Sequence, residues 1–269
     1  MQLTEVSAKT GYVWFRQGIW LFRRNPLAFL TLFFAYLLAM TVISVIPVIG
    51  GLLPLFFIPG VAVGFMAACR DTIAGKPVFP TILIDGFRSY GSVAAKRLVV
   101  LGFAYMIAMM AVFASSALAD GGTLLRLMTV GGPLDGAAVA NGDLSLALLA
   151  SMVLYVPVAM LFWFAPILAT WHDVPPVKAM FFSIVSCWRN RGAFVVYAVL
   201  WFAVSSAVSF GLSMLMRLAG VGDYAYAVLM PALIVTMTML YCSFYATYRG
   251  CFGMQEPATV KLPGPNADR

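Results

Sequence analysis

The sequence is short of charge. Asp, Glu, Lys and Arg together make up 10% of its 269 residues, whereas about 25% is typical of a soluble domain. Apolar residues make up 62%. A chain of this length cannot cover a water-exposed surface with so few charges. The composition therefore excludes a cytosolic enzyme, a nucleic-acid-binding module and a secreted disulfide scaffold, and it predicts a protein embedded in lipid.

The sequence also lacks the side chains that most catalytic and metal sites require. It has one histidine, and its four cysteines form no C-x-x-C pair and no cluster with that histidine, which argues against a zinc site. His172 and the adjacent Asp173 could form an acid–base pair, but no nucleophile motif accompanies them. We therefore expect no enzymatic activity, no metal site and no cofactor.

The apolar residues form runs that are long enough to cross a bilayer as helices. They predict an all-α, polytopic transmembrane bundle of six helices, in a single domain over residues 1–253, followed by a disordered cytoplasmic tail at 254–269. No Asp, Glu, Lys, Arg or His lies inside any predicted span, which argues against proton-coupled transport. The six predicted spans are Leu27–Ile46, Val48–Cys69, Leu98–Ala119, Leu144–Trp171, Phe194–Met216 and Tyr224–Tyr248.

The basic residues predict the orientation of these spans. Fifteen of the 17 Lys and Arg residues lie in the two terminal segments, between spans 2 and 3, or between spans 4 and 5. The other two, Arg126 and Arg217, lie in loops on the opposite side. Because cytoplasmic loops of membrane proteins are enriched in Lys and Arg, we predict that both termini are cytoplasmic.

Two sequence features suggest an internal repeat. The pattern R-N-x-x-A-F precedes span 1, at Arg24–Phe29, and span 5, at Arg189–Phe194. Prolines occur inside spans 2, 4 and 6 but not inside spans 1, 3 and 5. We therefore predict three like-oriented hairpins, each with an unbroken outgoing helix and a kinked returning helix. Basic, aromatic-rich segments precede the hairpins, at Tyr12–Arg24, Pro80–Lys96 and Pro176–Trp188. They are typical either of short amphipathic helices at the interface or of ordinary aromatic and basic anchors.

The starts of spans 1 and 5 carry candidate site residues. An asparagine at a helix start can accept hydrogen bonds from the free N–H groups, so both asparagines can act as caps. Alternatively, a helix start flanked by arginine lies where it could bind a lipid headgroup. The residues of this predicted lipid interface are Arg24, Asn25, Arg189, Asn190, Trp14 and Trp20. Separately, the small residues Gly60, Gly64 and Ala68 are spaced four apart on span 2, which predicts close helix packing.

Three stretches together resemble uncharacterised six-span inner-membrane proteins of proteobacteria. They are the aromatic segment from Trp14 to Pro26, the I-P-x-I-G-G turn at Ile46–Gly51 and the P-G-x-x-x-G-x-M-x-A-C stretch at Pro59–Cys69. More distantly, the chain resembles YciC-type proteins and the membrane domains attached to some glycerophosphodiesterases. The resemblance implies a bacterial inner-membrane location and a helical bundle, and it transfers no catalytic residue.

Two functional hypotheses follow. The first is a non-enzymatic inner-membrane protein that binds lipids or partner proteins in envelope organisation or in a membrane complex. The alternative is a permease for a neutral or lipid-like solute, which would pass through a cavity between the kinked spans 2, 4 and 6. The expected partners are membrane lipids and other inner-membrane proteins, and no nucleic acid is expected.

Overall fold

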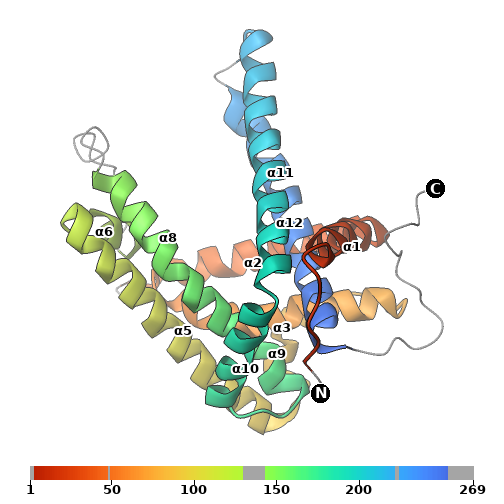
Figure 1. Cartoon of the computed structure of the whole chain (residues 1–269). Helices are drawn as coiled ribbons and strands as arrows, with labels where there is room; N and C mark the ends of the chain where they lie inside the picture. The colour runs from red at the N-terminus through yellow and green to blue at the C-terminus, as the bar shows by residue number, and fades with distance from the viewer. Residues whose placement is uncertain (1–2, 48, 130–142, 222–223, 254–269) are drawn as a thin grey trace. The chain divides into compact units, whose positions relative to one another are not determined.

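The computed structural model describes residues 3–47, 49–129, 143–221 and 224–253 (Figure 1). Within these ranges the chain is helical and contains no strand, which confirms the all-α fold class. Among the described residues, six helical segments are long and apolar enough to cross a membrane, as predicted. They are α2 (Pro26–Ser44), α3 (Leu53–Ile73), α5 (Gly91–Asp120), α8 (Asp143–Phe162) continued by α9 (Ala165–Trp171), α11 (Arg191–Leu218) and α12 (Ala225–Phe252).

Shorter helices occupy the segments before the hairpins. All three basic, aromatic-rich segments contain one: α1 (Thr10–Arg24), the 3₁₀ helix η1 (Pro80–Ile84) with α4 (Asp85–Arg88), and α10 (Pro176–Arg189). A further short helix, α6 (Thr123–Thr129), follows α5. The predicted tail at 254–269 lies outside the described residues, and the single domain over residues 1–253 stays a prediction.

The turn between spans 1 and 2 is longer than the sequence suggested. We predicted that span 2 begins at residue 48, but α3 begins at Leu53. Gly50 forms the turn, and its N–H donates to the carbonyl oxygen of Ile46 at 2.9 Å. A Cβ at Gly50 would lie 2.3 Å from that same oxygen. Only glycine fits there, and the tight turn delays the start of the helix.

The fourth span is interrupted rather than merely kinked. α8 ends at Phe162 and α9 begins at Ala165, because Pro166 has no N–H and its ring would clash with the carbonyl of residue 162. Ser183 bridges the gap: its hydroxyl donates to the carbonyl oxygen of Met160 at 2.7 Å and accepts from the N–H of Phe164 at 2.9 Å. In an unbroken helix these two backbone groups would bond to each other. The serine therefore satisfies both of them.

The contacts within the chain define two compact units. Unit 1 consists of Met1–Ala35, Phe65–Ile82 and Ser186–Arg269. In it, α1 packs against both α11 and α12, and α11 packs along α12 (Figure 1). The approach of α1 is close, because a Cβ at Gly18 would lie 2.3 Å from the Cβ of Ser243 on α12. On the other side, a Cβ at Gly11 would lie 2.2 Å from the carbonyl oxygen of Ala193 on α11.

Aromatic side chains fill the interior of unit 1. Phe33 on α2 and Phe65 on α3 both lie against Tyr241 of α12, with ring centroids 5.6 Å and 4.9 Å from that ring. Trp14 of α1 lies against Phe194 and Tyr197 of α11, at 5.2 Å and 6.3 Å. Two of these four contacts are edge-to-face and two are tilted, and aromatic pairs at these distances stabilise beyond simple burial. They link α2, α3 and α1 to the α11–α12 pair.

Unit 2 consists of Tyr36–Gly64 and Leu83–Val185. Its main feature is the α5–α8 hairpin, in which the two helices run side by side (Figure 1). α5 also packs against α4 and α9. Arg97 on α5 pairs with the carboxylate of Asp173, just after α9, and donates to the carbonyl oxygen of Ala169 at 3.4 Å. This contact fixes the base of α5 to the end of α9.

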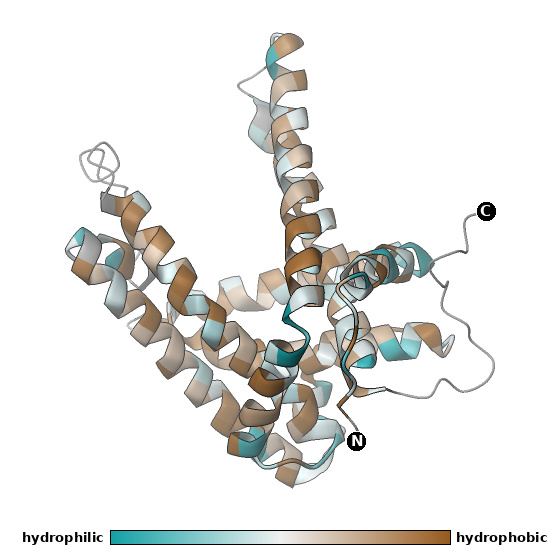
Figure 2. Ribbon diagram, in the orientation of Figure 1, coloured by the Kyte–Doolittle hydropathy of each residue, from teal (hydrophilic) through white to brown (hydrophobic). Residues whose placement is uncertain are grey.

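Large apolar side chains project outward from the long helices. Phe202 and Phe210 on α11 are both 72% exposed, and Figure 2 shows hydrophobic residues along the length of this helix. An exposed apolar surface of this extent is unstable in water. Since α11 has the length and composition of a membrane span, we interpret the surface as lipid-facing.

Candidate lipid-interface site

Two junctions between a short helix and a long one carry five of the six predicted lipid-interface residues, all except Trp14, and both junctions belong to unit 1. The first junction, formed by Trp20, Arg24 and Asn25, joins α1 to α2. The guanidinium carbon of Arg24 lies 4.6 Å from the centre of the Trp20 ring, a cation–π geometry. The side-chain oxygen of Asn25 accepts from the N–H of Ala28 at 3.4 Å. Asn25 is therefore placed to cap α2, which agrees with the first of its two predicted roles, helix capping.

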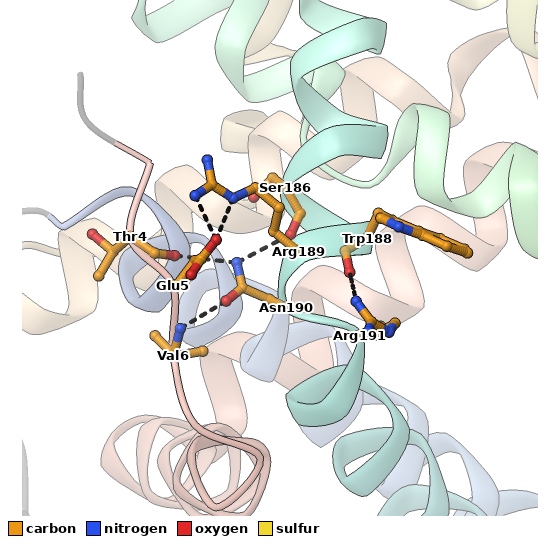
Figure 3. Close-up of polar contacts among 8 residues, drawn as sticks. All are labelled: Thr4, Glu5, Val6, Ser186, Trp188, Arg189, Asn190 and Arg191. Atoms are coloured by element: carbon orange, nitrogen blue, oxygen red, sulfur yellow. Dashed lines mark hydrogen bonds and ion pairs between the residues drawn. The ribbon is translucent and has the colours of Figure 1, made fainter.

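The second junction, formed by Trp188, Arg189, Asn190 and Arg191, joins α10 to α11 (Figure 3). The guanidinium of Arg191 lies 5.7 Å from the centre of the Trp188 ring and donates to the Trp188 carbonyl at 3.3 Å. The Trp188 side chain is 63% exposed. Like the first junction, the second thus presents an arginine stacked on a tryptophan, and Figure 2 shows it as hydrophilic beside the apolar α11.

Asn190 does not cap α11, which corrects the prediction for it. Its side chain makes no capping hydrogen bond and instead binds the N-terminal segment. Its oxygen accepts from the N–H of Val6 at 2.8 Å, and its amide donates to the carbonyl oxygens of Thr4 at 3.2 Å and Ser186 at 3.0 Å. Asn190 is 1% exposed. A buried amide needs hydrogen-bond partners, and two of the three partners of Asn190 are backbone groups of a segment about 185 residues away in the sequence, Val6 and Thr4.

The residues Thr4–Val6 form what we call the N-terminal strap. Besides its bonds to Asn190, the strap donates from the N–H of Thr4 to the carbonyl oxygen of Cys251 on α12, at 2.8 Å. The carboxylate of Glu5 forms an ion pair with Arg189 through two guanidinium nitrogens (Figure 3). The strap therefore joins the second junction to the end of α12.

The remaining predicted residues lie in different surroundings. Trp14 is 1% exposed, and a Cβ at Gly250 would lie 2.3 Å from its indole nitrogen. Its side chain is thus part of the packing between α1 and α12. Gly60, Gly64 and Ala68 are all buried, and a Cβ at Gly60 would lie 2.1 Å from the ring of Phe87. Whether lipid binds either junction stays a prediction.

The helices that precede the two junctions bury residues in the same register. Counted back from Asn25, the buried positions of α1 are 3, 4, 7, 11 and 14 residues away. Counted back from Asn190, those of α10 are 3, 4, 7 and 11 residues away. The position seven residues before each asparagine is small, Gly18 in α1 and Ser183 in α10. This shared register supports the predicted repeat, which stays a prediction.

The groups considered for catalysis or metal binding do not assemble into a site. Burial lowers the pKa of His172, and the neighbouring Asp173 is paired with Arg97. All four cysteines are buried, and burial together with the nearby Cys251 raises the pKa of the Cys187 thiol. In the part of the chain that the structure describes, no three His, Cys, Asp or Glu residues are placed to hold a metal ion.

Comparison with known proteins identifies the family. The chain is 67% identical over 265 residues to a probable inner membrane protein of Burkholderia thailandensis, and the match covers 98% of each chain. The chain belongs to the family of that inner membrane protein. No protein-family model matches the sequence, and no solved structure matches it. Because the part of the chain that the structure describes contains six helices that could cross a membrane, this member of the family is a multi-pass inner-membrane protein.

The sequence located Trp20, Arg24 and Asn25 at the first junction and Arg189 and Asn190 at the second. It missed the stacked pair Trp188 and Arg191, and it missed Glu5 and the strap. One signal was available: Glu5 is the only acidic residue before Asp71. A lone carboxylate in a basic segment is a candidate for an ion pair. The sequence gives no means of choosing its partner among the many arginines, since Arg189 lies 184 residues away.

Proposed function

We propose that this protein is a non-enzymatic inner-membrane protein that binds anionic phospholipid at the two junctions. The observation that carries the proposal is the arrangement common to both junctions, an arginine stacked on a tryptophan at the start of a long apolar helix. Tryptophan is favoured at headgroup depth. Guanidinium groups bind phosphate through paired N–H donors. The arginine therefore matches the lipid phosphate, and the tryptophan matches the headgroup region around it.

The charge distribution supports a cytoplasmic location for the junctions. Both occur in segments that belong to the basic side of the chain, and the inner leaflet of a bacterial membrane faces the cytoplasm. We infer from the positive-inside rule that both termini are cytoplasmic. Basic residues near an anionic surface attract it by about 1 kcal/mol each, which corresponds to about a fivefold change in affinity per arginine.

Native mass spectrometry of the purified full-length protein tests the proposal. The variant R24Q/R191Q removes the stacked arginine from each junction, and we expect retention of phosphatidylglycerol to fall by about fivefold for each arginine. The matched control is R126Q/R217Q, which makes the same change in net charge in the loops predicted to lie outside. Equal retention by the two double variants would refute the proposal.

A distant relationship to YciC-type proteins is part of the same proposal. The basic, aromatic segments at the junctions support a role in envelope organisation or in a membrane complex. The alternative, a permease for a neutral or lipid-like solute, draws on the interruption between α8 and α9. Uptake of a lipid-like solute into proteoliposomes that depends on this protein would favour the permease over the lipid-binding role.

A further inference from the structure

We propose that the N-terminal strap contains a built-in competitor for anionic lipid, in which the Glu5 carboxylate occupies Arg189 where a lipid phosphate would bind. This inference rests on the proposed function and deepens it, because it names what regulates one of the two junctions. In the strapped state the second junction is partly neutralised, and lipid must displace Glu5 to reach Arg189.

The geometry of the ion pair supports competition. Two nitrogens of the Arg189 guanidinium, Nε and Nη2, face a single oxygen of Glu5 (Figure 3). This fork is the same donor pair that guanidinium groups use to bind phosphate. A lipid phosphate and the Glu5 carboxylate therefore require the same donors and cannot both use them. Arg191 is held separately against Trp188, so it does not replace Arg189 in this contact.

The strap does not depend on the ion pair for its position. Thr4 and Val6 are held through backbone groups, which bond to the buried Asn190 side chain and to the carbonyl oxygen of Cys251. The Glu5 and Arg189 side chains, by contrast, are 60% and 50% exposed. Exposed pairs of this kind shift an equilibrium by only about twofold to fivefold. Glu5 can therefore swing away from Arg189 while the strap stays in place.

The ion pair between Asp173 and Arg97 provides a control for the one between Glu5 and Arg189, because its arginine is less exposed. Asp173 pairs with Arg97, whose side chain is 18% exposed and also donates to a backbone carbonyl. Removing the Asp173 charge would leave Arg97 held and largely covered. D173N therefore makes the same change in net charge as E5Q without presenting a new guanidinium to lipid.

The experiment measures phosphatidylglycerol retention by the full-length protein in native mass spectrometry, for the wild type, E5Q, D173N, R189Q and E5Q/R189Q. We expect E5Q to retain about twofold to fivefold more lipid than the wild type and D173N to match the wild type. We expect R189Q to retain less than the wild type, and E5Q/R189Q to equal R189Q, because Glu5 acts only through Arg189. Trypsin cleavage after Lys9 should be equally slow in E5Q and the wild type.

The possible failures are distinguishable. If R189Q loses lipid but E5Q matches the wild type, the competition is refuted while the lipid site stands. If R189Q matches the wild type, Arg189 takes no part in lipid binding and the competition is refuted, while loss of lipid from R24Q/R191Q would still support the lipid-binding proposal. Equal gains in E5Q and D173N would show a general charge effect and overturn the inference. Faster cleavage of E5Q after Lys9 would also overturn it, since the strap would then depend on the ion pair.

Discussion

Replacing Gly18 with alanine should destabilise unit 1, and the structure gives the size of the effect. The new Cβ would lie 2.3 Å from the Cβ of Ser243 and 3.1 Å from the carbonyl oxygen of Met239. Ordinary contact begins at 3.4 Å, so α1 must move away from α12 by about 1 Å. Neither obstacle is a flexible side-chain end. Overpacking of this kind costs about 1–3 kcal/mol in the free energy of unfolding.

The assay is thermal unfolding of the purified protein in nanodiscs, followed by tryptophan fluorescence. A change of 1 kcal/mol shifts the midpoint by about 2–4 °C in a chain of this size, so we expect G18A to unfold about 2–12 °C below a control that makes the same Gly-to-Ala change at an open helix position. The matched control is G211A on α11, where a Cβ would meet nothing within 4 Å. Alanine is the better helix former, so G211A should equal or exceed the wild type. Unfolding of G18A at the temperature of G211A would refute the close approach of α1 to α12.

Two further predictions concern the second junction. N190A leaves the Val6 N–H and the Thr4 carbonyl without their side-chain partner. The loss should weaken attachment of the strap by about 2 kcal/mol and speed trypsin cleavage after Lys9 about thirtyfold. An unchanged cleavage rate would contradict the attachment of the strap to Asn190. For Cys187, burial raises the pKa of the thiol above the ordinary 9.0, so the folded state keeps the proton that the unfolded state loses above pH 9.0. The free energy of unfolding should therefore fall above that pH in the wild type and fall less in C187A, as chemical unfolding at pH 7 and pH 10 would show.

The spans could be predicted because a bilayer imposes a length that sequence reveals directly. Between Asn25 and Cys69 there is no charge, and a stretch of that length needs two crossings. The residues at which the helices begin and end were harder to predict from the sequence. The start of α3 at Leu53 depends on how Gly50 folds back on Ile46, and this is a matter of backbone geometry. Pattern reasoning placed the turn correctly but could not say how many residues it uses.

The candidate site could be predicted only in part, because one residue type can serve two roles. Trp14 and Trp20 both lie in a basic, aromatic segment, yet Trp14 is buried against α11 and α12 while Trp20 stacks on Arg24. Similarly, Asn25 and Asn190 occupy the same place in a shared motif, but only the Asn25 side chain bonds to the helix that follows it. What separates the members of each pair is a contact with a distant segment. The local pattern carries no information about such contacts.

The short helices follow a common rule of packing, which connects the repeat to the strap. Gly86 of α4 lies against α3, because a Cβ at Gly86 would lie 3.2 Å from the carbonyl oxygen of Gly60. Ser183 of α10 inserts into the break between α8 and α9, and Gly18 of α1 lies against Ser243 of α12. For α4 and α10 the partner is the returning helix of the predicted hairpin before them, and the small residue permits close approach. For α1 the partner is α12, the returning helix of the third predicted hairpin. Because the strap directly precedes α1, the packing of α1 against α12 brings Thr4 to Cys251 and Glu5 to Arg189.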